Sequence, residues 1–106
     1  MSIVEQRDYQ VYNGKLPELV RLYETEGIAI QIEELGDLVG AFTVDIGAQL
    51  STYSHLWRYD SFEERAVRRA RLQARDDWKA FLPKIQPLIH AQANRILIPT
   101  AFSPLR

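Results

Sequence analysis

Residues 50–59 alternate between large aromatic or apolar side chains and small or polar ones. This pattern predicts a β-strand whose successive side chains point to opposite faces of a sheet. One face of that strand would carry Tyr53, His55, Trp57 and Tyr59. Ser61 and Glu64 follow with the spacing of a capping box, which predicts that the strand leads directly into a helix. We therefore expect a sheet to form around this strand.

Three further stretches have the composition of strands, at residues 3–12, 38–46 and 91–99. Asn13-Gly14 is a turn signal that ends the first of them, and Pro99 ends pairing in the last. The connection at residues 47–49 is short enough for a hairpin. The stretch 38–46 should therefore pair antiparallel with the aromatic strand. In that stretch we expect Leu38 and Phe42 to share a face and Val39 to lie opposite them.

Apolar residues at three- and four-residue spacing predict a helix over residues 15–26, with Gly27 as a left-handed cap. Its stripe consists of Leu16, Leu19, Val20 and Tyr23. Residues 28–35 favour a second short helix that ends at Gly36. An irregular loop or a strand are the alternatives for this stretch, since Ile28, Ile30 and Ile32 occupy every second position.

The helix after Ser61 is expected to present one line of apolar residues at four-residue spacing. The members of that line are Ala66, Ala70, Ala74 and Trp78. Asp76 is expected to cap a fresh turn within this segment. Pro83 and Pro87 should kink the segment or restart it, since proline lacks the amide hydrogen that a helix interior needs.

The element order strand, helix, strand, strand, helix, strand predicts an α+β fold, a ferredoxin-like sandwich with helices on one face of a four-stranded antiparallel sheet. We interpret residues 1–106 as one domain. Both faces of the sheet are expected to carry large apolar side chains, and two helices can cover only one face. A second copy of the chain, packed sheet to sheet about a two-fold axis, would cover the other.

Composition narrows the classes of function. Of 106 residues, 46% are hydrophobic and 25% are charged, as in soluble globular proteins. Cysteine is absent, which excludes disulfides, thiol nucleophiles and cysteine-based zinc sites. The net charge of −1 provides no general attraction to nucleic acid, and no apolar run has the length of a membrane span. We expect a cytoplasmic protein.

Several short motifs, taken together, resemble the NIPSNAP family over nearly the whole chain. They lie at residues 27, 38–42, 46–47, 55–61, 64–65, 78–85, 94–99 and 102–104, and include the runs His55-Leu56-Trp57-Arg58-Tyr59-Asp60-Ser61 and Trp78-Lys79-Ala80-Phe81-Leu82-Pro83. The resemblance implies the dimeric α/β-barrel superfamily and thus a homodimer through the sheet face. It implies no agreed catalytic residues, because the family supplies none.

Four residues are candidates for a site between sheet and helices: His55, Tyr9, Asn94 and Arg95. His55 lies among aromatic rings, where an imidazole serves as a general base, as a haem ligand or as a structural hydrogen-bonding group. Arg95 would share a face with Arg7 or Arg58 and, with that partner, hold a carboxylate or an oxygenated substrate. The alternative is a set of ion pairs with nearby acidic residues.

Other constellations are interpreted as structural. The tyrosines either line a pocket or fill the core. The arginines between residues 65 and 75 are flanked by carboxylates, which favours a solvated, ion-paired helix surface over phosphate binding. Two histidines without helical pairing do not predict a metal site. His90 is expected near the end of a helical segment, where it would interact with the helix terminus.

The sequence thus predicts an interaction protein or a small-molecule-binding homodimer. The alternatives are a cofactor-sparing monooxygenase or isomerase of the dimeric α/β-barrel type and a haem-binding protein. Neither the cofactor nor the substrate is specified by any motif.

Overall fold

The computed structural model describes residues 1–47 and 49–106, and its elements follow the predicted order. In chain order they are β1 (Ile3–Val11), α1 (Leu16–Leu22), the π-helical turn η1 (Tyr23–Gly27), α2 (Ile28–Leu35), β2 (Asp37–Thr43), β3 (Thr52–Tyr59), α3 (Phe62–Ala74), α4 (Asp76–Ile85), the 3-10 turn η2 (Gln86–Leu88) and β4 (Ile89–Leu97). The strands form an antiparallel sheet in the order β2-β3-β1-β4. This is the ferredoxin-like α+β fold that the sequence predicted.

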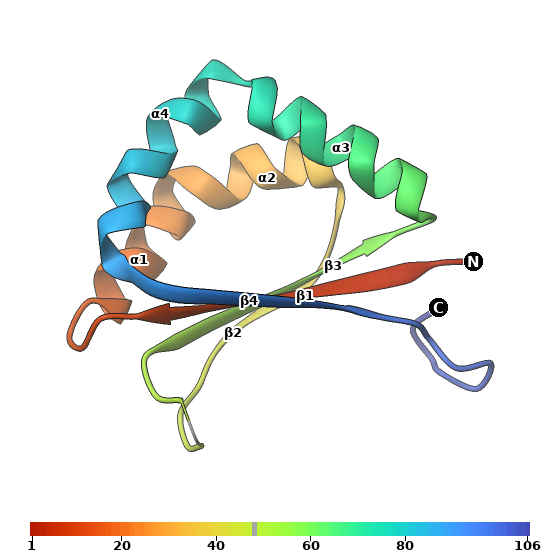
Figure 1. Cartoon of the computed structure of the whole chain (residues 1–106), viewed down its shortest axis with the longest axis horizontal. Helices are drawn as coiled ribbons and strands as arrows, with labels where there is room; N and C mark the ends of the chain where they lie inside the picture. Colours follow the sequence, from red (N-terminus) through yellow and green to blue (C-terminus); the bar gives the residue numbers. More distant parts are fainter. Residues whose placement is uncertain (48) are drawn as a thin grey trace.

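The helices lie together on one side of the sheet, as Figure 1 shows. β1 is central, and its Arg7 is registered with His55 on β3 and with Asn94 on β4. Alternate residues of the strands therefore face the helices together. The core lies between the two layers, and its fully buried large side chains include Ile3, Leu19, Leu35, Trp57, Tyr59, Leu72 and Phe81. The predicted aromatic face of β3 is thus the face that the helices cover.

The face opposite the helices carries polar groups as well as the large apolar side chains that the sequence predicted. Along the centre of this face, Ser54 donates a hydrogen bond to Asp8 at 2.6 Å, and Gln6 also donates to Asp8. Apolar groups lie nearer the edge strands, where Phe42 is 57% exposed and Leu97 is 37% exposed. We call this surface the open face.

Strand β2 is shorter and less regular than predicted. It ends at Thr43, and the connection to β3 runs from residue 44 to residue 51. The predicted turn at residues 47–49 includes residue 48, which lies outside the described residues. The register shifts between Leu38 and Gly40, so Leu38 pairs with Trp57 on the covered side while Phe42 pairs with Ser54 on the open face. Leu38 and Phe42 therefore do not share a face, because a bulge adds one residue to the alternation.

The first helical segment continues through Gly27, contrary to the predicted left-handed cap. Gly27 has helical angles (φ −74°, ψ −40°), and the amide of Ile28 donates to the carbonyl of Tyr23. Glycine is needed here for close packing, because a Cβ atom would lie 2.5 Å from Cζ of Phe81. The predicted second helix is confirmed, and it ends at Gly36 with φ +89°.

The start of α3 matches its sequence signature. The amide of Glu64 donates to Oγ of Ser61 at 3.0 Å. The Glu64 carboxylate accepts from the amide of Asp60 at 2.7 Å, one residue before the expected position.

The apolar line predicted for α3 is wrong. Ala66, Ala70 and Ala74 are exposed, and Leu72 is buried instead. Arg75 adopts an extended conformation (ψ 133°) that separates α3 from α4, so Trp78 belongs to a second helix with its own direction.

Three local predictions in the C-terminal half need correction. Asp76 is the first residue of α4 rather than its cap, and the helix runs on through Pro83. Pro87 does restart the backbone, as part of the turn η2. His90 lies in β4 and stacks on Tyr12 with ring centroids 5.1 Å apart, not at a helix terminus. None of the helices in the described part of the chain is long and apolar enough to cross a membrane.

Replacing Gly27 by alanine tests the contact between η1 and α4. Helix propensity alone favours alanine over glycine by about 1 kcal/mol. Here the added methyl group collides with the Phe81 ring, so we expect Gly27→Ala to lower the free energy of unfolding by about 1–3 kcal/mol in urea denaturation. The double variant Gly27→Ala with Phe81→Leu should recover part of the loss. An unfolding midpoint raised by Gly27→Ala would contradict this account.

Candidate functional site

A buried carboxylate lies at the centre of the covered side. Glu5 has no exposed side-chain surface, and it accepts hydrogen bonds from Arg65 at 3.0 and 2.8 Å, from Asn94 at 2.9 Å and from Arg7 at 3.2 Å. These donors come from α3, β4 and β1. The carboxylate therefore ties the central strand to an edge strand and to the helix above it.

The surroundings of Glu5 keep it ionised. Burial works to raise the pKa of this carboxyl, but the hydrogen bonds from Arg65 and Asn94, with the charges of Arg7 and Arg65, lower the pKa to about 2. Burial likewise works to lower the pKa of Arg7, and its contacts with Tyr9 and Glu5 outweigh burial and raise it. Both groups are therefore charged at neutral pH.

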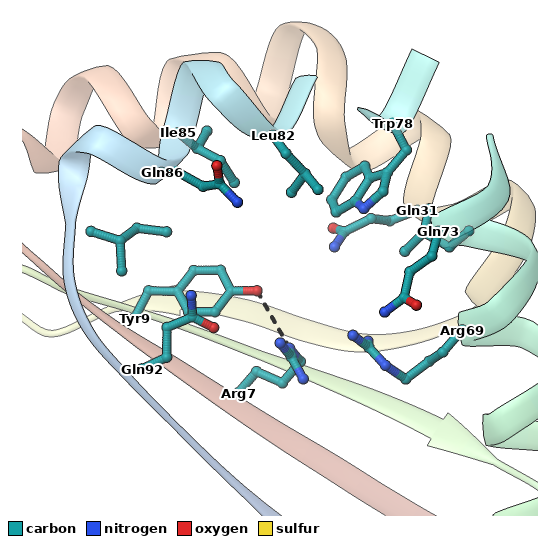
Figure 2. Close-up of a pocket in the computed structure, with 12 residues that line it drawn as sticks. Arg7, Tyr9, Gln31, Arg69, Gln73, Trp78, Leu82, Ile85, Gln86 and Gln92 are labelled. Carbon is teal, nitrogen blue, oxygen red and sulfur yellow. Dashed lines mark hydrogen bonds between the residues drawn. The ribbon is translucent and has the colours of Figure 1, made fainter. Parts of the chain in front are cut away.

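A cavity of about 220 Å³ lies beside this network, between the sheet and helices α2, α3 and α4. Figure 2 shows the side chains around it. The residues in its wall are Arg7, Tyr9, Gln31, Arg69, Leu72, Gln73, Trp78, Leu82, Ile85, Gln86, Ile89 and Gln92. The guanidinium groups of Arg7 and Arg69 lie on one side of the cavity. The apolar side chains of Trp78, Leu82 and Ile85 lie on the other, together with the amides of Gln31 and Gln86.

Several polar groups in this wall have unused capacity for hydrogen bonds. Nε of Arg7 donates to the hydroxyl of Tyr9 at 3.4 Å, a long contact that is drawn in Figure 2. Gln31 is 2% exposed, and its Oε1 has no hydrogen-bond partner. Among the described residues, no carboxylate forms an ion pair with Arg69. A buried acceptor without a donor is costly, so this wall is suited to an additional polar group.

The structure brings some of the predicted candidates together and separates others. Tyr9 lines the cavity, and Asn94 lies on the same face through its bond to Glu5. Asn94 and Arg7 also line a second cavity of about 160 Å³. Arg95 pairs with Gln6 on the open face, so it shares a face with Arg58 and not with Arg7. The register therefore places Arg95 on the opposite side of the sheet from His55, Tyr9 and Asn94.

His55 is enclosed by aromatic side chains. It is fully buried, and its ring lies 5.1 Å from Tyr9 and 5.0 Å from Tyr53 between centroids. The indole of Trp57 donates to Nδ1 of His55 at 2.8 Å, so the neutral imidazole carries its hydrogen on Nε2. Among the described residues this Nε2 has no partner, and His55 is in the wall of neither of the two cavities described above.

The electrostatics of His55 agree with a structural role. Burial, followed by the charge of Arg7, lowers its pKa to about 3. The ring is therefore neutral at physiological pH. No observation favours the general-base or haem-ligand interpretation.

Comparison with known proteins identifies the family. The sequence model of the NIPSNAP family matches residues 4–104. The chain belongs to the NIPSNAP family. A crystal structure of a NIPSNAP family protein from Agrobacterium tumefaciens is 48% identical, with all of both chains covered and a TM-score of 0.97. Another, from the same organism and described as having unknown function, is 44% identical over 99% of this chain and 94% of that one, with a TM-score of 0.96.

More distant relatives extend the comparison. Human NipSnap homolog 3A is 30% identical over 93 residues, which cover 87% of this chain and 37% of that protein. This NIPSNAP chain spans between 19% and 37% of the length of the curated relatives it matches. A cofactor-independent oxygenase from Streptomyces nogalater is 10% identical, covering 97% of each chain with a TM-score of 0.66. That likeness shows the fold alone.

Arg69 and Gln31 are among the cavity residues of this NIPSNAP chain that sequence reasoning missed. Arg69 belongs to the arginine run that was interpreted as a solvated surface. That interpretation does describe Arg68, which pairs with Glu64 at 2.7 Å. The available signal was the spacing of Arg65, Arg69 and Leu72, which lie four and three residues apart on one side of a helix. Gln31 carried no signal, since a glutamine in a helix is usually exposed.

The Glu5 network predicts a specific dependence of stability on acid. Because folding lowers the Glu5 pKa from 4.5 to about 2, the network contributes fully above pH 4.5 and is lost as pH falls toward 2. We expect this loss to be roughly 3 kcal/mol in the free energy of unfolding measured by urea denaturation. Glu5→Gln should be less stable at pH 7 and show a flatter decline.

The matched control is Glu18→Gln, which changes an exposed carboxylate in α1. Its stability should fall with acid as steeply as that of the parent protein. Parallel acid profiles for the parent and Glu5→Gln would show that Glu5 is not the group responsible.

Proposed function

We propose that this NIPSNAP chain is a homodimeric ligand-binding protein whose cavity between sheet and helices takes a small oxygenated molecule. The observation that carries the proposal is the mixed wall of this cavity, in which two guanidinium groups and the buried amide of Gln31, whose Oε1 has no hydrogen-bond partner, are combined with apolar side chains. Ligand sites are typically apolar hollows with a few convergent polar groups. This cavity has that character.

The size of the cavity limits its ligand. An engineered protein cavity of about 150 Å³ holds benzene. The volume of about 220 Å³ found here admits one ring or a short chain with one or two polar substituents. Trp78, Leu82 and Ile85 offer an apolar surface to the body of such a molecule. The arginines and Tyr9 offer donors, and Gln31 offers an acceptor.

Nuclear magnetic resonance titration tests ligand binding at this cavity. We expect small aromatic compounds with oxygen substituents to shift the indole resonance of Trp78, which lines the cavity, more than that of Trp57. Leu82→Trp should abolish the shifts, because the larger ring fills the space. Val67→Trp, which changes an exposed residue of α3, is the control and should leave them intact. Shifts that persist in Leu82→Trp would place binding elsewhere.

The dimer in this proposal forms through the open face. Four exposed or half-exposed apolar groups lie on or near that face: Val39, Phe42, Leu97 and Ile98. In a two-fold contact each face meets a copy of itself, so opposite charges on one face can pair across the axis. Asp8 and Arg95 both lie on the open face and provide such a pair. The resemblance to dimeric α/β barrels supports the same arrangement.

A single charge on the open face should separate the two copies. Phe42 is 57% exposed there, and Val67 is 50% exposed on α3. We expect light scattering to give the mass of two chains for the parent protein and for Val67→Glu, and the mass of one chain for Phe42→Glu. The reason is that a buried unpaired carboxylate is strongly unfavourable at an interface. A parent protein that stays monomeric at micromolar concentration would refute the assembly.

A further inference from the structure

We infer that the ligand of the cavity is an organic carboxylate, held between the guanidinium groups of Arg7 and Arg69. Its apolar body would lie against Trp78 and Leu82. This inference deepens the proposed function and rests on it. It names the chemical class of the ligand and the two residues that select it.

The charge of this region is unbalanced. Arg7 and Arg65 pair with the carboxylate of Glu5, and Arg69 lines the cavity beside Arg7. Arg65 donates two hydrogen bonds to the Glu5 carboxylate, at 3.0 and 2.8 Å. The contact between Glu5 and Arg7 is longer, at 3.2 Å. Among the described residues, Glu5 thus pairs with two of these guanidinium groups, and no carboxylate forms an ion pair with the third, Arg69. An anionic ligand would restore the balance, because like charges in a partly buried region repel each other.

The two cavity arginines come from different layers and face the same space. Arg7 extends from the central strand, and Figure 2 shows its guanidinium group and that of Arg69, from α3, pointing toward one another. Contacts with Glu5 and Tyr9 fix the orientation of Arg7. A planar guanidinium presents paired donors that match the two oxygens of a carboxylate. The pair is therefore arranged for an anion before any ligand arrives.

The opposite wall argues for an organic anion rather than inorganic phosphate. Trp78 is 6% exposed and Ile85 is 2% exposed, and Leu82 lies between them in the cavity wall. A small fully hydrated ion would leave these apolar surfaces in contact with water. A carboxylate with an aromatic or aliphatic body of benzoate size covers them and fits the volume of about 220 Å³.

Three aromatic probes of related shape and different charge, together with inorganic phosphate, test the inference on the full chain. The aromatic probes are benzoate, its neutral isostere benzamide and the cation benzylamine. We expect benzoate to shift the Trp78 indole resonance with an affinity at least tenfold higher than that of benzamide, since a charge-assisted hydrogen bond is stronger than a neutral one. Benzylamine and phosphate should not bind measurably. The benzoate affinity should also fall as salt is added.

Two matched variants assign the preference to Arg69. Arg69→Gln keeps a polar side chain and removes the charge, so it should weaken benzoate binding about tenfold or more and leave benzamide unchanged. Arg71→Gln removes an exposed charge from the same helix and should change neither affinity. Arg69 is only partly buried, and none of the ion pairs among the described residues includes it. Circular dichroism and thermal unfolding of Arg69→Gln check that the fold is intact, so that a loss of benzoate binding reports on recognition.

The outcomes separate this inference from the proposed function. Benzamide binding as tightly as benzoate, or benzoate binding unchanged by Arg69→Gln, would overturn the carboxylate preference while the cavity remained a ligand site. Phosphate matching benzoate would overturn the requirement for an organic body. If none of the probes shifts the Trp78 resonance, or if the shifts persist in Leu82→Trp, both the inference and the proposed function fail.

Discussion

The buried carboxylate of Glu5 is the constraint on which the covered side of the sheet depends. An ion removed from water is tolerated only if it is paired and hydrogen-bonded, and here three side chains supply that compensation. Two of them, Arg65 and Asn94, lie far from Glu5 in the sequence. Their bonds set the position of α3 over β1 and the register of β4 beside it. The same bonds leave Arg7 facing the cavity, so the structural network and the candidate site share one residue.

The elements of the fold could be predicted where local pattern and tertiary packing agree. The alternation in β3 gave the covered aromatic face, and the Ser61 and Glu64 spacing gave the start of α3. Prediction failed where tertiary packing imposes a conformation that differs from the one the local sequence favours. Gly27 is ordinarily a helix terminator, but here the Phe81 ring requires a residue without a side chain inside a continuing helix. The bulge near Val39 likewise has no local signal. The apolar alternation in β2 is compatible with pairing to β3 either with or without an extra residue at this position.

The candidate site was predicted only in part, for a related reason. Tyr9 and Asn94 were found because strand alternation fixes the face of each residue once the sheet is known. For α3 the alanine line and the arginine line offered competing faces, and hydrophobicity favoured the alanines. In the structure the arginine side of α3 faces the sheet instead, because the buried carboxylate of Glu5 requires the guanidinium group of Arg65. The three alanines of the predicted line are exposed. The hydrophobic pattern is analysed for each helix and strand separately. It therefore cannot reveal that a residue of a strand requires a particular side chain from the helix packed above it.

The shifted register of β2 has a consequence for behaviour at high concentration. β2 forms one border of the sheet, and a regular border is a template on which the strand of another molecule can add. The extra residue near Val39 breaks the even spacing of amide and carbonyl groups that such addition requires. Repeated addition of strands from other molecules, which would lead to fibres, is therefore disfavoured at β2.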